Sequence, residues 1–156
     1  MYRRWWINTG IVDRELYLDS LVESLYFSKD SDEEPSWEEL EKEAMNSKEY
    51  KEWIKCWKLF DEYLNNHDFD IHINDFDEIV IKVWGNEDQV KEIAEEILDI
   101  LEKCFEDQDL YITATAQPEC PECGWLGRFS DKYCSKCGTP LLEVKKLTFN
   151  RKREKQ

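Results

Sequence analysis

Four cysteines in the C-terminal part constrain this chain more than any other feature. From Cys120 the sequence reads CPECGWLGRFSDKYCSKCG, which is C-x2-C, ten residues and a second C-x2-C. Two residues between cysteines let both thiolates of a tight turn face one ion, and the glycine after each pair accepts a backbone conformation that larger residues resist. Two such turns brought together form a tetrahedral shell of four thiolates. The spacing therefore predicts a metal site made by Cys120, Cys123, Cys134 and Cys137.

This segment resembles a small zinc ribbon of the CPxCG...YCxxCG type over residues 117–142. The four cysteines fall on the family's ligand positions, and Pro121 and Tyr133 stand where such ribbons often place a proline and an aromatic residue. The resemblance implies one structural zinc ion, because four cysteines leave no open coordination position. Iron in a rubredoxin-like site and a pair of disulfides are the alternatives. Rubredoxin-like knuckles usually lie further apart, and a cytosolic chain keeps its thiols reduced.

Charge divides the chain into two parts. The formal net charge is −15 over 156 residues, but residues 1–110 carry −19 and residues 111–156 carry +4. The acid is densest at residues 30–43 and 61–78, and the basic residues gather at 145–155. An acidic body is repelled by phosphate backbones and attracted to basic surfaces. Nucleic acid is therefore expected to contact only the C-terminal part, if any part of the chain.

Apolar periodicity predicts the elements that precede the cysteines. Alternation of apolar and polar residues indicates strands, and apolar residues at i, i+3 and i+4 indicate helices. Strands are expected at residues 2–8, 69–74, 79–84 and 110–116, with a turn at Gly10 after the first. Helices are expected at about 14–27, over 36–65 with a restart near 46–49, and over 86–105. Capping-box patterns, Ser36 with Glu39 and Asn86 with Gln89, are expected to open the second and the last of these helices.

With the helical region at 36–65 set aside as an insertion, these elements follow the order β, α, β, β, α, β. That order resembles the ferredoxin-like arrangement of an antiparallel sheet with helices on one face. The expected fold class is α+β, with an acidic domain at residues 1–116, a zinc ribbon at 117–142 and a frayed basic tail at 143–156. Such a fold hosts many functions and identifies none.

One face of the expected sheet carries aromatic residues. If the strand phases hold, Trp6, Trp84 and Tyr111 share a side, and an aromatic sheet face is how RNA-recognition modules stack bases. The surplus helix, however, has an apolar stripe with Trp53, Ile54 and Trp57 that needs cover. We therefore expect that helix to pack on this face and bury it.

Nothing in the sequence identifies a catalytic centre. His67 and His72 cluster with Asp68 and Asp70, but no third partner is evident, so a solvated polar edge is the expectation. Motifs for nucleotide binding, serine hydrolysis and zinc proteolysis are missing from the sequence. Cys56 and Cys104 fall on apolar helix faces, where core packing is expected. The chain is interpreted as non-enzymatic.

Two functions compete. In the first, the acidic body binds a basic surface of a partner, such as a nucleic-acid-binding protein. By composition alone this resembles the nucleic-acid-mimicking inhibitors of phages and mobile elements, and the opposing interpretation is that the acid only keeps the chain soluble. In the second, a zinc-ribbon accessory factor contacts nucleic acid, or a transcription or RNA-processing complex, through its C-terminal part. A cytoplasmic location without membrane contact is expected, since no apolar run spans a bilayer.

Overall fold

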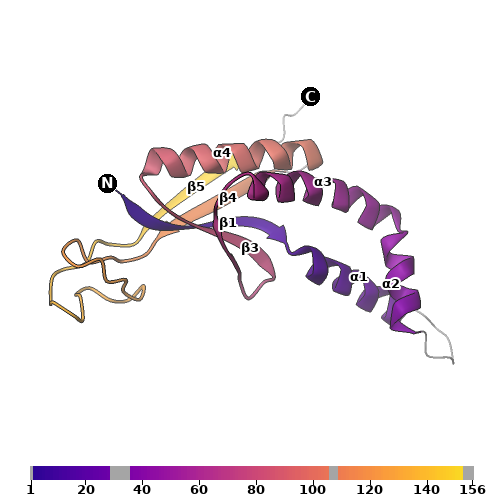
Figure 1. The fold of residues 1–156 in the computed structure, drawn as a ribbon, viewed down its shortest axis with the longest axis horizontal. Coiled ribbons are helices and arrows are strands. Elements are labelled where there is room, and N and C mark those ends of the chain that lie inside the picture. The colour runs from indigo at the N-terminus through magenta and orange to yellow at the C-terminus, as the bar shows by residue number, and fades with distance from the viewer. Residues whose placement is uncertain (1, 29–35, 106–108, 153–156) are drawn as a thin grey trace.

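A five-stranded antiparallel sheet organises the chain in a computed structural model, which describes residues 2–28, 36–105 and 109–152. The strands are β1 (Arg3–Val12), β2 (Asp70–Ile73), β3 (Glu78–Gly85), β4 (Leu110–Ala116) and β5 (Lys145–Arg151). They lie in the order β2-β3-β1-β4-β5, and every neighbouring pair is antiparallel. The helices among the described residues are α1 (Arg14–Ser28), α2 (Trp37–Met45), α3 (Lys48–Asn65) and α4 (Glu87–Cys104). The expected α+β class is confirmed (Figure 1).

Helix starts follow the sequence signals closely. Asn86 and Gln89 form a reciprocal capping box at the start of α4, with both hydrogen bonds at 2.9 Å. Ser36 accepts from the Glu39 amide at the start of α2, and Ser47 accepts from Tyr50 at the start of α3. The restart expected near residues 46–49 is therefore a true break between two helices.

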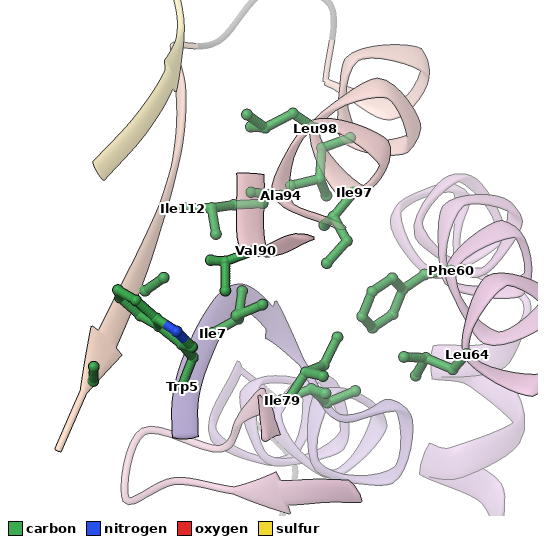
Figure 2. Packing of buried hydrophobic residues seen from close by; sticks show 14 residues of the cluster. Trp5, Ile7, Phe60, Leu64, Ile79, Val90, Ala94, Ile97, Leu98 and Ile112 are labelled. Carbon is green, nitrogen blue, oxygen red and sulfur yellow. The ribbon is translucent and has the colours of Figure 1, made fainter. Parts of the chain in front are cut away.

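The main core lies between α4 and one face of the sheet (Figure 2). Strand alternation points Trp5 and Ile7 of β1 toward α4, where Val90 and Ile97 meet them. The Trp5 indole N–H donates to the Gly85 carbonyl at 3.1 Å, so its polar atom is satisfied inside the core. We call the face that packs on α4 the inner face and the opposite one the outer face.

The first three helices form an arm that leaves the sheet at the end of β1 (Figure 1). α1 packs chiefly on α2, around a small cluster centred on Val22, Leu40 and Ala44. α3 joins the arm to the main core, because its second half packs beside α4 and places Phe60 and Leu64 in the core. The arm thus has a core of its own, while α3 belongs to both.

The expectation that the surplus helix covers the aromatic sheet face is wrong. The apolar stripe of α3 is used elsewhere: Trp53 stacks on Tyr17 of α1 with ring centroids 4.1 Å apart, and Phe60 enters the main core. Trp84 and Tyr111 therefore remain 59% and 68% exposed.

The first strand is longer than predicted. β1 continues to Val12 through an irregularity after Asn8, and Gly10 adopts a positive φ of 71° within it. The Asn8 side chain accepts from the Gly10 amide at 3.0 Å, which stabilises this local conformation. The expected turn at Gly10 is thus a β-bulge, a conformation that glycine adopts without steric cost.

The basic segment after the cysteines is a strand rather than a frayed tail. β5 pairs with β4 from Lys145 with Ala116 to Arg151 with Leu110, and its Leu147 and Phe149 pack against the main core. The Arg151 guanidinium binds three carboxylates of α4, those of Glu95, Asp99 and Glu102, and Lys145 pairs with Glu87. The part of the expected tail beyond residue 152 lies outside the described residues.

Cys56 and Cys104 are joined by a disulfide, where the sequence suggested only apolar packing. The bond links α3 to α4 across a Cα–Cα distance of 5.5 Å. Their separation of 48 residues gives no local signal of this pairing, which depends on α3 lying beside α4.

No helix in the described ranges has the length and apolarity needed to cross a membrane.

Candidate functional site

The four predicted ligands come together in the segment that connects β4 to β5. Their sulfur atoms all lie within 4.8 Å of one another, and three of the pairs are 3.5, 3.5 and 3.9 Å apart. An ion bonded to four thiolates at about 2.3 Å separates the sulfur atoms by about 3.8 Å. Cys120, Cys123, Cys134 and Cys137 can therefore hold one metal ion, as a zinc-ribbon-like site requires. Among the described residues, no other such group of potential metal ligands is found.

Each cysteine pair has the same local backbone. Gly124 donates to the Cys120 carbonyl and Gly138 to the Cys134 carbonyl, both at 2.9 Å, and the two glycines have φ of 76° and 74°. The sulfur of Cys120 also accepts from the Cys123 amide at 3.4 Å. Backbone amides that point at sulfur stabilise the thiolate form, which is the form that binds metal.

The thiols of Cys137 and Cys123 have pKa values shifted in opposite directions when no cation neutralises them. Hydrogen bonds from Thr139, whose hydroxyl lies 3.1 Å from the sulfur, lower the pKa of Cys137 to about 6. The Trp125 backbone amide lowers the pKa of Cys123, but contacts with Cys134 and Cys120 outweigh it and raise that pKa to about 12. Four thiolates at these distances repel one another, so the cluster needs a cation to ionise fully.

The cysteine segment, residues 117–144, is fastened to the sheet at its base. The buried Arg3 side chain donates to the Gln117 carbonyl at 2.7 Å and reaches the Leu142 carbonyl at 3.4 Å, so it contacts both ends of the segment. Burial lowers the pKa of Arg3, and the Glu119 carboxylate opposes this shift. Burial also raises the pKa of Glu119, against the attraction of Arg4 and Arg3.

The outer face of the sheet continues from this base. The strand register places Arg4 beside Trp84, and Trp6 between Lys82 and Thr115. Trp6, Trp84 and Tyr111 therefore share one face, as their strand phases predicted. The Trp6 indole N–H donates to the Gln117 side-chain oxygen at 2.8 Å, which connects the face directly to the cysteine segment.

The histidine cluster is divided between two parts of the molecule. His67 follows α3, stacks on Phe69 with centroids 5.0 Å apart, and lies 4.0 Å from the Glu96 carboxylate. His72 is on β2 and approaches the Trp6 ring edge-on at 5.7 Å on the outer face. Both histidines are exposed.

A cavity of about 510 Å³ lies where β1 and β4 separate, and sequence reasoning did not find it. Pairing of these strands ends at Asn8 with Thr113. The gap is lined by Trp53, Trp57 and Phe60 of α3 and by Ile100 and Leu101 of α4. The bulge that starts this separation follows Asn8, and Gly10 was its only local signal.

Comparisons with protein-family models, with curated proteins and with solved structures give no match for this chain. Any functional conclusion must therefore come from the site itself.

Proposed function

We propose that this protein is a non-catalytic accessory factor that binds nucleic acid through its C-terminal cysteine segment and the adjoining outer sheet face. The observation that carries the proposal is an uncovered sheet face with aromatic and cationic side chains beside the metal-ligating cysteines. Exposed Trp84 and Tyr111 are costly on a free surface, and such patches usually serve binding. Arg4, Lys82 and Lys146 supply positive charge on the same face.

We propose that zinc occupies the cysteine cluster. A closed set of four thiolates is the donor set of structural zinc sites, and zinc bound there would hold the segment that borders the outer face. The chemistry it supplies is structural. The protein's own residues do the rest: Arg3 anchors the base of the segment, and Gln117 fixes the Trp6 indole.

The separation of charge within the fold supports this assignment. Much of the acid lies on the helices, and on α4 it is partly neutralised by Arg151 and Lys145 of β5. Among the described residues, the outer-face cations Arg4, Lys82 and Lys146 form no ion pair. The net charge of −15 therefore does not describe the outer face. The acidic residues of the helices repel phosphate groups, which discourages nonspecific contact of nucleic acid with the helical side.

We also propose that residues 2–116 adopt a ferredoxin-like arrangement. The order β2-β3-β1-β4 with antiparallel neighbours, and α4 on one face, favours it. α1 packs on α2 and α3 rather than on the sheet, and this is the main difference from the ferredoxin-like arrangement. The function proposed above rests on the side chains of the face, not on this resemblance.

The direct test measures binding of fluorescently labelled DNA and RNA, single-stranded and duplex, to the zinc-loaded full chain at low salt. The full chain is required because β5 belongs to the sheet. A variant with Lys82→Glu and Lys146→Glu should bind more weakly than wild type, whereas Lys48→Glu, at an exposed side chain at the start of α3, should not. Absence of binding to every nucleic acid would refute the proposed function.

A second candidate is that the arm binds a basic protein surface. Exposed aromatic side chains gather where α1 ends and α2 begins, with Phe27 81% and Trp37 48% exposed, beside the acidic residues Glu38 and Glu39. Aromatic anchors within a charged rim suit protein interfaces. The other acidic residues expected here, between residues 30 and 34, lie outside the described residues.

This second candidate predicts a partner protein whose binding weakens as the salt concentration rises. Affinity capture with wild type should enrich proteins that a Glu38→Gln, Glu39→Gln, Glu41→Gln variant does not, and raised salt should release the same proteins. Identical capture by both proteins would refute a role for these carboxylates.

A further inference from the structure

The outer face alternates aromatic rings with cations. The Lys82 ammonium lies 4.3 Å from the centroid of the Trp6 ring, and the Arg4 guanidinium lies 5.9 Å from that of Trp84. Tyr2 stacks on Trp84 with centroids 6.5 Å apart and planes inclined by 16°. These contacts hold the rings and the charges side by side, so one ligand can meet both.

A concavity of about 500 Å³ adjoins these rings, between the outer face and the cysteine segment. Its volume falls within the range of small-molecule sites. Its lining combines aromatic, cationic and amide side chains with the Asp70 carboxylate and two aliphatic residues, and includes Arg4, Trp6, Lys82, Trp84, Gln117 and Leu126. A planar ring placed here has an indole to stack on, while cations at its edge can meet a phosphate.

Polar groups occupy most outward positions of β4 and β5. Between Trp6 and Tyr111 the outward positions of β4 are Thr115 and Thr113. On β5, Lys146 and Thr148 lie across from these two threonines, and Asn150 lies across from Tyr111. Hydroxyl and amide groups of this kind bind phosphates and sugars, and such contacts carry no sequence information. Asp70 and Glu78 are the carboxylates on this face, against the cations Arg4, Lys82 and Lys146.

This combination selects unpaired bases. Stacking on Trp84 or Tyr111 needs a base whose flat side is free, and bases in a duplex are covered by their neighbours. A sheet face also lacks the protruding helix that reads a major groove. We propose that the outer face is a platform for single-stranded nucleic acid, on which bases stack on the exposed rings and phosphates meet Lys82, Arg4 and Lys146. This inference rests on the proposed function and names its ligand class.

The test uses labelled ten-nucleotide oligomers, oligothymidine and oligouridine, and a duplex of equal length, with the zinc-loaded full chain. Both single strands should bind more tightly than the duplex. Trp84→Ala and Tyr111→Ala should each raise the Kd for single strands about tenfold, which is the effect expected for loss of one stacked base. Trp37→Ala, at an exposed indole on the arm, is the matched control and should leave the Kd unchanged.

Salt dependence gives a second readout. Single-strand contacts change the logarithm of the binding constant by about −0.7 per phosphate neutralised, so three cations predict a slope of about −2. Lys82→Ala should reduce the slope by about 0.7, whereas Trp84→Ala should weaken binding with little change in slope. Circular dichroism of each variant checks that the fold is intact, since the side chains removed lie outside the core.

The outcomes separate this inference from the proposed function. Equal binding of duplex and single strands, with wild-type affinity in both aromatic variants but weaker binding in the Lys82→Glu, Lys146→Glu variant, would overturn the stacking platform and keep nucleic-acid binding. No binding to any oligomer would overturn both. A mass change on Trp84→Ala in light scattering, without oligomer binding, would show that a second copy of the chain covers the face and would also overturn the platform.

Discussion

Removing the metal from the cysteine cluster should loosen β5 while leaving the rest of the sheet intact. β4 and β5 are neighbours in the sheet, and residues 117–144 connect them. With metal bound, the four sulfur atoms clamp this connection, and the Leu142 amide donates to the Glu119 carbonyl at 2.8 Å near its base. The connection then behaves as a short loop. Without metal it becomes a long flexible one.

The size of the effect follows from loop-closure entropy. Closing a flexible loop of about 28 residues costs about 3 kcal/mol, against about 1.2 kcal/mol for a loop of about four residues. The difference of about 1.7 kcal/mol corresponds to roughly a twentyfold rise in the population with β5 detached. Burial of Leu147 and Phe149 and the ion pairs of Arg151 act against detachment in both states.

Hydrogen exchange followed by mass spectrometry measures this directly. In the chelated protein and in Cys137→Ser, amides of β5 should exchange roughly twentyfold faster than in the metal-loaded wild type. Amides of β1, β3 and α4 should change little. Ser135→Ala is the matched control, because Ser135 lies in the same turn and is not a ligand. Equal acceleration in β5 and β1 would refute the reasoning, since the metal would then support the whole fold. Unchanged exchange in β5 would refute it as well.

The sequence predicted those parts of the molecule that depend on local chemistry. Asn86 and Gln89 identified the start of α4, and the paired C-x2-C turns identified four cysteines that lie within metal-binding distance, because caps and knuckles are set by residues a few positions apart. The segment at residues 145–151 was missed although Leu147 and Phe149 alternate with polar residues. Its high charge concealed a strand that α4 carboxylates neutralise only in the folded protein.

Longer-range relations lay beyond the sequence. The pairing of Cys56 with Cys104 requires that α3 and α4 lie side by side, and no pattern fixes that. The outer face is exposed because the apolar stripe of α3 packs elsewhere. Trp53 of this stripe stacks on Tyr17 within the arm and so does not cover the sheet. The strand phases were sufficient to place the aromatic residues on one face. They were insufficient to tell whether that face is covered.

Three further predictions concern stability. Replacing Cys56 and Cys104 by serine should lower the free energy of unfolding in urea by about 4 kcal/mol at most, which is the chain-entropy value for a link across 48 residues. Wild type under reductant should lose the same amount. A smaller loss under reductant would mean that the bond resists reduction. Arg3→Ala should cost about 2–3 kcal/mol because it strands two part-buried carbonyls and a buried carboxylate, whereas exposed Arg4→Ala should cost under about 0.5 kcal/mol. Equal losses would contradict the anchoring role of Arg3. Burial, reinforced by a hydrogen bond to a carboxylate, raises the pKa of Tyr63 above its usual value. The folded state therefore keeps this proton above pH 10, where the unfolded chain releases it, so stability falls as pH rises above about 10 by up to about 1.4 kcal/mol per pH unit. Tyr63→Phe should show a shallower fall between pH 10 and 11 in urea titrations, because its side chain does not titrate, and parallel falls in the two proteins would contradict the assignment.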